Sequence, residues 1–370
     1  MKFKIKQNLI NKALFKTVGI IDKKGIIPSL SNVKIEAKDN SVIFVGTDMD
    51  IIIKSTTDAA VEEGGSTTVQ AHILHDIIKK IPDGEEIKMH LEDKKSLKLS
   101  CGKSHFSMPT ISAEDFPSFA EESMSIEFLV NSQNLMRAID QTRFAVSNDE
   151  TRRYLNGIFF QITPEGPNSI FNAVAIDGHK LALSRFTIKN FSDNIPSIIV
   201  PKKTIGELKK IIDGFNGDVK IRFSKLKMII SCQNDSIASK IIDADFPDYQ
   251  KIIPKENNLV LPLMRKKIFA TIDRVATMVD DRHNSISMTI KGNKLIFSAI
   301  TTEGGAATEE LDVEAPEMDL KIAFNARYLL EIINQLNDEK INFRFKNNET
   351  PVLIDSGNDI DAYVIMPIRL

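Results

Sequence analysis

Apolar side chains recur along the chain with two different spacings. Leu9, Ile10, Ala13, Leu14 and Val18 follow the three-to-four-residue repeat of a helix with one buried face, and the segment 73–81 repeats the pattern. Short segments of alternating β-branched residues, such as 33–37 and 220–223, lie between such stretches and end in turn residues. The pattern predicts six helices, at 7–18, 71–81, 132–146, 202–213, 263–279 and 325–337.

The chain also repeats itself at a spacing of about 130 residues. Ser100-Cys101 returns as Ser231-Cys232, and Phe116-Pro117 returns as Phe246-Pro247. A fainter third copy begins near residue 259, so we expect three similar domains at 1–122, 123–253 and 254–370. Each domain holds two successive runs of strand, helix and further strands, which predicts an α+β fold with two helices packed on antiparallel sheets per domain.

Composition narrows the class of protein. With 370 residues and 42% apolar side chains, the chain has enough material for more than one core and is not disordered. Two cysteines argue for a reducing compartment, and we find neither a signal peptide nor an apolar run long enough to cross a membrane. We therefore expect a cytoplasmic protein that is not bound to a membrane.

The charges are unevenly distributed. The formal net charge is −2, which by itself argues against a protein that neutralises DNA. The six predicted helices, however, carry nine more basic than acidic residues, and the rest of the chain carries an excess of eleven acids. If these helices line one surface, that surface is positive and suits phosphate groups. A merely solvated basic face is the plainer alternative for any single helix.

Four strings in order carry a resemblance to a known family. They are TRRYLNGIFF at 151–160, AIDGHKLAL at 175–183, ADFPDYQKIIP at 244–254 and AYVIMPIRL at 362–370. With these strings the chain resembles, over its full length, the β subunits of bacterial DNA polymerase III, the DNA sliding clamps. The resemblance implies a head-to-tail homodimer that closes six domains into a ring, with helices lining the hole.

The same resemblance implies a function without catalysis. Such a clamp encircles double-stranded DNA without sequence preference and tethers the polymerase, so it acts as a processivity factor. Its expected partners are the α subunit of DNA polymerase III, the clamp loader and other proteins with a clamp-binding motif. No catalytic residue, metal or cofactor is expected.

Similarity to the family assigns three groups of residues. A hydrophobic groove for partner peptides is expected from Arg152, Tyr154, Leu155, Gly178, His179, Lys180, Leu181, Pro247, Lys251, Ile252, Val364, Met366, Pro367 and Ile368. The DNA-facing cations are expected to be Lys12, Lys16, Lys24, Lys79, Lys80, Arg137, Arg143, Arg153, Lys202, Lys203, Lys209, Lys210, Arg265, Lys266 and Lys267. The dimer interface is expected to join Phe106 and Met108 of one chain to Thr277 and Met278 of the other. Ile176 and Lys251 depart from common family residues, which leaves the preferred peptide motif open.

Other candidate chemistry is weaker. Gly102-Lys103-Ser104 lacks the first glycine of a phosphate-binding loop, and His72 and His75 lack a third metal ligand at suitable spacing. Asp177 and His179 have no nucleophile elbow to complete a triad. Two alternatives stay open: an oligomeric repeat enzyme that binds an anionic metabolite between basic helices, and a structural repeat scaffold.

Overall fold

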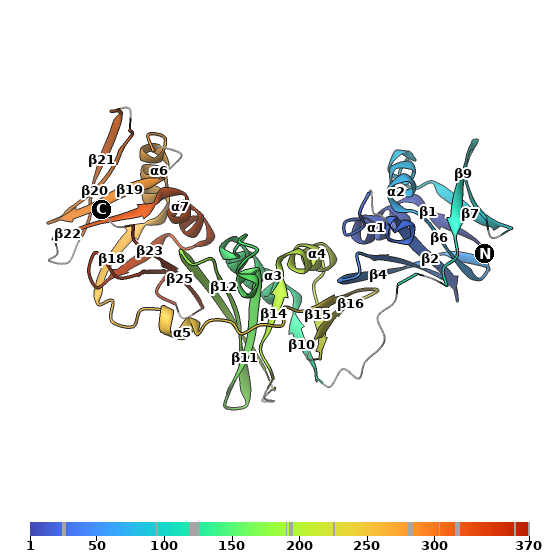
Figure 1. The fold of residues 1–370 in the computed structure, drawn as a ribbon, viewed down its shortest axis with the longest axis horizontal. Helices are drawn as coiled ribbons and strands as arrows, with labels where there is room; N and C mark the ends of the chain where they lie inside the picture. The colour runs from blue at the N-terminus through green and yellow to red at the C-terminus, as the bar shows by residue number, and fades with distance from the viewer. Residues whose placement is uncertain are drawn as a thin grey trace. The chain divides into compact units, whose positions relative to one another are not determined.

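The computed structural model describes residues 1–23, 27–93, 95–114, 116–117, 126–189, 191, 195–224, 226–279, 284–302, 304–314, 319–358 and 360–368. The chain divides into two compact units (Figure 1). Unit 1 comprises Met1–Met136 and Lys203–Ile241, and unit 2 comprises Arg137–Lys202 and Ile242–Leu370. Each unit is described by itself.

Unit 1 is built on one antiparallel sheet of thirteen strands. Its order is β10 (Ile126–Asn131), β15 (Asp218–Phe223), β16 (Lys227–Cys232), β17 (Asp235–Lys240), β4 (Ile51–Asp58), β3 (Ser41–Thr47), β2 (Asn32–Lys38), β6 (Gly65–Gln70), β9 (Ser104–Ile111), β8 (Ser96–Cys101), β7 (Glu86–Glu92), β1 (Lys2–Lys6) and β5 (Ala60–Glu63). The helices α1 (Gln7–Val18), α2 (Ala71–Lys80) and α4 (Lys202–Ile212) and a 3₁₀ turn at Pro28–Ser31 complete it. The helix α3 (Ser132–Thr142) spans the division between the units.

Unit 2 holds two antiparallel sheets. The eight-stranded sheet runs β14 (Ile198–Pro201), β11 (Gly157–Glu165), β12 (Asn168–Ile176), β13 (Lys180–Ile188), β25 (Asp361–Ile365), β24 (Val352–Asp355), β23 (Lys340–Phe345) and β18 (Leu259–Met264). The four-stranded sheet runs β21 (Ala306–Asp312), β20 (Lys294–Ile300), β19 (Ser285–Lys291) and β22 (Asp319–Asn325). Helices α5 (Tyr249–Ile252), α6 (Arg265–Ala276) and α7 (Ala326–Gln335) and 3₁₀ turns at Arg143–Ala145 and Arg153–Leu155 connect the strands.

The element order confirms the predicted repeat. A strand leads directly into a helix and then into several strands at β1-α1, β6-α2, β10-α3, β14-α4, β18-α6 and β22-α7. All six predicted helices are present. The boundary expected at residues 122 and 123 lies outside the described residues.

Seven of the twelve predicted helix ends shift by one to four residues, and two apolar positions also differ from the prediction. The helix at 132–146 becomes a 3₁₀ turn after Thr142, and the helix at 263–279 begins only at Arg265 because the preceding residues still pair in β18. Asn325 caps α7 by accepting the Tyr328 N–H at 3.2 Å, so it precedes the helix. Leu9 and Ile73 are exposed, although their spacing places them near the buried face.

Helix α1 shows how the repeat packs. Its buried residues Ile10, Ala13, Leu14 and Thr17 lie at helical spacing, and the helix packs on α2, β3 and β4. Gly46 on β3 permits the close approach, since a Cβ there would lie 2.3 Å from the Thr17 carbonyl oxygen. A larger residue at this position would push the helix off the sheet.

A buried ion pair joins the first repeat to strands of the second within unit 1. Strand β17 pairs with β4 from Asp235↔Ser55 to Ser239↔Ile51. The Lys16 ammonium of α1 donates to Asp235 Oδ2, and Ser55 Oγ donates to Asp235 Oδ1 at 2.5 Å. Both charged side chains are only 11% exposed, so each depends on the other for compensation.

We expect Asp235→Asn to lower the free energy of unfolding by about 3 kcal/mol, because it leaves the Lys16 ammonium buried without a counter-charge. The matched control is Asp50→Asn, which breaks the exposed Lys240–Asp50 pair of 2.7 Å at the same strand junction. The control should cost less than about 1 kcal/mol. Urea unfolding followed by circular dichroism measures the free energy of unfolding of both variants. Equal losses would show that the Lys16–Asp235 pair stabilises the fold no more than the exposed pair does.

His75 on α2 is a buried histidine whose Nε2 has no hydrogen-bond partner among the described residues. Burial lowers the pKa of its imidazole below the usual 6.5, and the neighbouring Lys79 ammonium lowers the pKa further. The folded chain therefore favours the neutral ring at neutral pH.

Below pH 6.5 the unfolded chain takes up a proton that the folded His75 refuses, so stability falls as the pH drops towards the folded pKa. We expect His75→Leu to remove this pH-dependent loss of stability. In the unmodified chain the loss amounts to up to about 1.4 kcal/mol of unfolding free energy per pH unit. Unfolding free energies at pH 7.5, 6.5, 5.5 and 5.0 test it. His105→Leu, on the exposed surface of β9, should instead run parallel to the unmodified chain.

Candidate functional site

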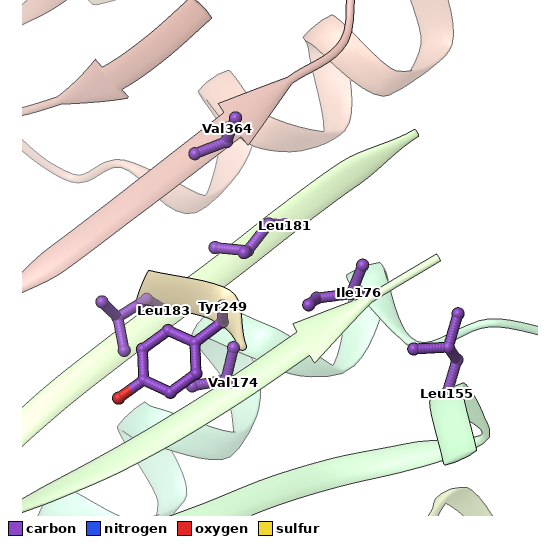
Figure 2. Close-up of a cluster of buried hydrophobic side chains, with 7 residues drawn as sticks. All are labelled: Leu155, Val174, Ile176, Leu181, Leu183, Tyr249 and Val364. Atoms are coloured by element: carbon purple, nitrogen blue, oxygen red, sulfur yellow. The ribbon is translucent and has the colours of Figure 1, made fainter. Parts of the chain in front are cut away.

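A cluster of buried apolar side chains centres on β12, β13 and β25, in the middle of the eight-stranded sheet of unit 2 (Figure 2). Its members are Leu155, Val174, Ile176, Leu181, Leu183, Tyr249 and Val364, and each is less than a tenth exposed. Three of the predicted groove residues, Leu155, Leu181 and Val364, belong to it, and a fourth, Ile252, packs against it. The structure thus brings together segments that lie up to about 200 residues apart in sequence.

Strand register explains why these side chains meet. Ile176 of β12 lies opposite Leu181 of β13, and Leu181 lies opposite Val364 of β25. Residues opposite each other in an antiparallel ladder point to the same face, so the three side chains form one apolar row across three strands. Figure 2 shows Leu155 approaching the end of this row from its 3₁₀ turn.

The turn between β12 and β13 forms one edge of the row. Asp177 Oδ1 accepts the backbone N–H groups of His179 at 2.8 Å and Lys180 at 2.9 Å, which closes the turn. Gly178 has a φ of +93°, and a Cβ there would lie 2.9 Å from Arg152 Nη1. The positive φ favours glycine here, and the guanidinium of Arg152 lies over the turn.

Lys180, a predicted groove residue, does not lie on the surface. Its side chain is 4% exposed, and Nζ donates to Asp177 Oδ2 at 2.7 Å and lies 3.3 Å from Glu331 Oε2. The ammonium also sits 3.9 Å from the centre of the Tyr328 ring, against which the His179 ring stacks. Lys180 therefore anchors the turn to α7, and we assign it a positioning role.

The other predicted groove residues lie around the apolar row, and most of them are exposed; we call them the rim. Tyr154 and Met366 are 37% and 41% exposed, which leaves large apolar groups in contact with solvent. The Met366 N–H donates to the His179 carbonyl at 2.9 Å, and the Ile368 N–H donates to Ala323 at 2.8 Å. Arg152, Gly178, His179 and Lys251 are exposed, while Pro247, Pro367 and Ile368 are partly buried.

The DFPDY segment, residues 245–249, lies beneath the cluster. The Phe246 ring stacks on Phe159 with centroids 4.5 Å apart, and the Tyr249 hydroxyl donates to Gln161 Oε1 at 2.7 Å. Burial raises the pKa of this Tyr249 phenol. Phe159, Tyr328 and Glu331 were not anticipated from the sequence, since no motif marks them and two lie on a helix about 150 residues from the turn that they support.

The predicted DNA-facing cations fall into two classes. Lys12, Lys79, Lys80, Lys266 and Lys267 are exposed and have no carboxylate partner within the described residues. Others are held by the protein: Lys16 by Asp235, Arg137 by Asp361 at 2.8 Å, Arg143 by Asp140 at 3.4 Å, Lys203 by Asp48 at 2.5 Å and Lys210 by Glu207 at 2.8 Å. Lys202 donates to Asn148 at 2.5 Å.

The remaining members of that group are less constrained. Arg153 is exposed, Lys209 and Arg265 are partly buried, and Lys24 lies outside the described residues. Lys16 differs most from expectation: its side chain is mostly buried, so its ammonium holds the β17–β4 junction and does not add to a surface charge.

The four predicted interface residues differ in exposure. Phe106 is 36% exposed, Thr277 is exposed and Met278 is partly buried, whereas Met108 is 5% exposed in the core of unit 1. Met108 therefore supports β9 from within, whereas Phe106 and Ile111 are apolar side chains of this strand that solvent reaches.

Other side chains with potential metal-binding or nucleophilic chemistry have structural roles. Asp48 Oδ1 accepts the N–H groups of Asp50 and Ile51 at 3.0 and 2.7 Å, so it closes a turn. Burial raises the pKa of the Cys232 thiol to about 11 and also raises that of Cys101, which makes both poor nucleophiles at neutral pH. Among the described residues we find no cluster of three metal-ligating side chains and no helix capable of spanning a membrane.

Comparison with known proteins agrees with this architecture. Models of the DNA polymerase III beta subunit match residues 1–120 as its N-terminal domain, 129–248 as its central domain and 250–369 as its C-terminal domain. The chain is 33% identical to the beta sliding clamp of Caulobacter vibrioides and 29% identical to that of Escherichia coli, with full coverage of both sequences in each case.

Solved structures give the same result. A crystal structure of the C. crescentus beta sliding clamp superposes with a TM-score of 0.96 at 33% identity, covering 100% of this chain and 99% of that one. The clamp of Bartonella birtlesii, solved bound to griselimycin, superposes with a TM-score of 0.95 at 32% identity and full coverage of both chains. The chain belongs to the DNA polymerase III beta subunit family, the bacterial sliding clamps.

Proposed function

We propose that two copies of this chain close head to tail into a ring that encircles duplex DNA and holds the replicative polymerase on it. The single observation that carries this function is the match of three successive clamp domains along the whole chain. The ring catalyses no reaction and works in the cytoplasm. Its domains are 1–122, 123–253 and 254–370, and Phe106 contacts the Thr277–Met278 segment of the second copy.

The free lysines match the demands of sliding. Lys12, Lys79, Lys80, Lys266 and Lys267 present flexible ammonium groups that attract phosphates without reading bases. Because most of the other basic side chains on the helices are paired within the protein, the positive potential towards DNA is moderate. A topologically linked ring needs no tight binding, and phosphate contacts of this kind exchange readily and weaken as salt increases.

The apolar row and its rim suit short extended peptides. Leu155, Leu181 and Val364 form the buried base of this row, while the exposed Tyr154 and Met366 offer apolar surface that an incoming side chain can cover. Burying two or three large side chains gains about 4–9 kcal/mol before ordering costs. The resulting affinity is of micromolar order, which allows the polymerase α subunit, the clamp loader and other partners to exchange.

Retention on DNA tests the ring. After loading onto a nicked circle by the clamp loader, the protein should stay bound in about 0.5 M salt and should be released when the circle is linearised, because only topology holds it. Gel filtration of labelled protein with DNA measures retention. Light scattering should give about twice the 41.4 kDa chain mass. Equal retention on linear and circular DNA would refute the proposed function.

Loss of one exposed methionine tests the groove. We expect Met366→Ala to weaken binding of a fluorescent peptide from the tail of the polymerase α subunit about tenfold, since the bound peptide would bury this side chain. Met264→Ala is a matched control, because Met264 is also 41% exposed but lies on β18. The control should change the affinity less than twofold in a fluorescence anisotropy titration. Equal peptide affinities of the two variants would refute the assignment of Met366 to the groove.

A further inference from the structure

A polar cleft opens between α1 and α2 of unit 1, which lie side by side in Figure 1. Its volume is about 450 Å³, within the range of sites that hold small molecules. Asn8, Asn11, Lys12 and Phe15 line it from α1, Lys79 lines it from the last turn of α2, and Asp83 lines it from the turn that follows. The peptide groove lies in unit 2, so this cleft is a separate feature.

The unusual residue of the cleft is Phe15, which is 55% exposed. The equivalent helices of the other repeats align through their buried residues: Ile10 and Leu14 correspond to Leu135 and Ile139 of α3 and to Ile268 and Ile272 of α6. In this alignment Phe15 corresponds to Asp140 and Asp273. The fold therefore tolerates a charged residue at this position, and packing gives no reason for an aromatic ring.

The polar groups around Phe15 include unsatisfied ones. Asn11 Oδ1 is buried and accepts no hydrogen bond from the described residues. Lys12 and Lys79 are exposed, and no carboxylate in the described part of the chain pairs with either. Two cations against the single carboxylate of Asp83 leave the cleft with a net positive charge, which favours an anionic ligand.

We propose that this cleft seats one unpaired nucleotide of single-stranded DNA. The Phe15 ring stacks on the base, the amide of Asn8 or Asn11 hydrogen-bonds to the base edge, and Lys12 and Lys79 contact the flanking phosphates. Sites for single-stranded nucleic acid combine an aromatic platform with cations in this way. Duplex DNA does not fill the seat, because its bases are already stacked and paired.

The inference rests on the proposed function, because a ring held on DNA keeps these helices near the strand. One stacked base gives only weak binding. The ring encircles the DNA, however, so the local concentration of DNA at the cleft is high. A gap, a flap or a primer end passing the helices supplies the unpaired nucleotide. Binding of this nucleotide in the cleft thus slows the ring at such sites, whereas the ring slides freely on duplex DNA.

Tryptophan substitution gives a direct test, since the chain contains no tryptophan. In Phe15→Trp, a 12-nucleotide oligo(dT) should quench the fluorescence of the indole by stacking on it. The matched control is Leu9→Trp, because Leu9 is also exposed on α1 but does not line the cleft. Its fluorescence should change little. Equal quenching of the two variants, or no quenching of Phe15→Trp, refutes the proposed nucleotide seat.

A second measurement avoids any change caused by the probe. In anisotropy titrations with labelled oligo(dT), Phe15→Ala should bind about 5- to 100-fold more weakly than the unmodified chain, and Leu9→Ala within twofold of it. Unchanged binding by Phe15→Ala refutes the proposal, as does an equal loss in Leu9→Ala.

The two functional claims can fail separately. Phe15→Ala should still be retained on circular DNA, since retention depends on ring closure and not on the seat. Loss of retention by the unmodified chain would refute the clamp, whereas normal retention together with unchanged oligo(dT) binding by Phe15→Ala refutes the seat alone.

Discussion

The pairing of β13 with β25 is the contact on which the candidate groove depends. It joins residues 180–184 to residues 361–365, so strands of the central and last repeats share one sheet. Without it, Leu181 and Val364 would not be neighbours, and the Met366 N–H would not reach the His179 carbonyl. The groove is thus a product of how two repeats join, which explains why its residues are scattered along the chain.

Partly buried ion pairs between repeats stabilise the strand junctions that position the surface features. Arg137 contacts Asp361 at the start of β25, and Lys16 contacts Asp235 at the start of β17. In each case a cation on the first helix of one repeat reaches a carboxylate on a strand contributed by another repeat. Removing one partner of such a pair would leave the other partly shielded from solvent and unpaired, so these cations hold the repeats in register while the exposed Lys12 on α1 remains available to phosphates.

Local features were predictable from the sequence, and contacts distant in sequence were not. Helical spacing placed α1 at its observed ends, and the repeated Ser-Cys and Phe-Pro pairs revealed the order of the elements. The inward direction of Lys180 could not be foreseen, because its partners Tyr328 and Glu331 lie about 150 residues away and belong to no motif. Likewise, a basic residue on a helix gives no sign of whether a carboxylate from another repeat will cover it.

The three repeats keep their buried positions apolar or small and vary at exposed ones. Ile10, Leu135 and Ile268 occupy one equivalent buried position, where loss of volume would leave a cavity. Phe15 occupies a position that holds Asp140 and Asp273 in the other repeats, where the fold requires no apolar side chain. The Phe15 ring is 55% exposed and contributes little to the core, which is why we assign it to the proposed nucleotide seat.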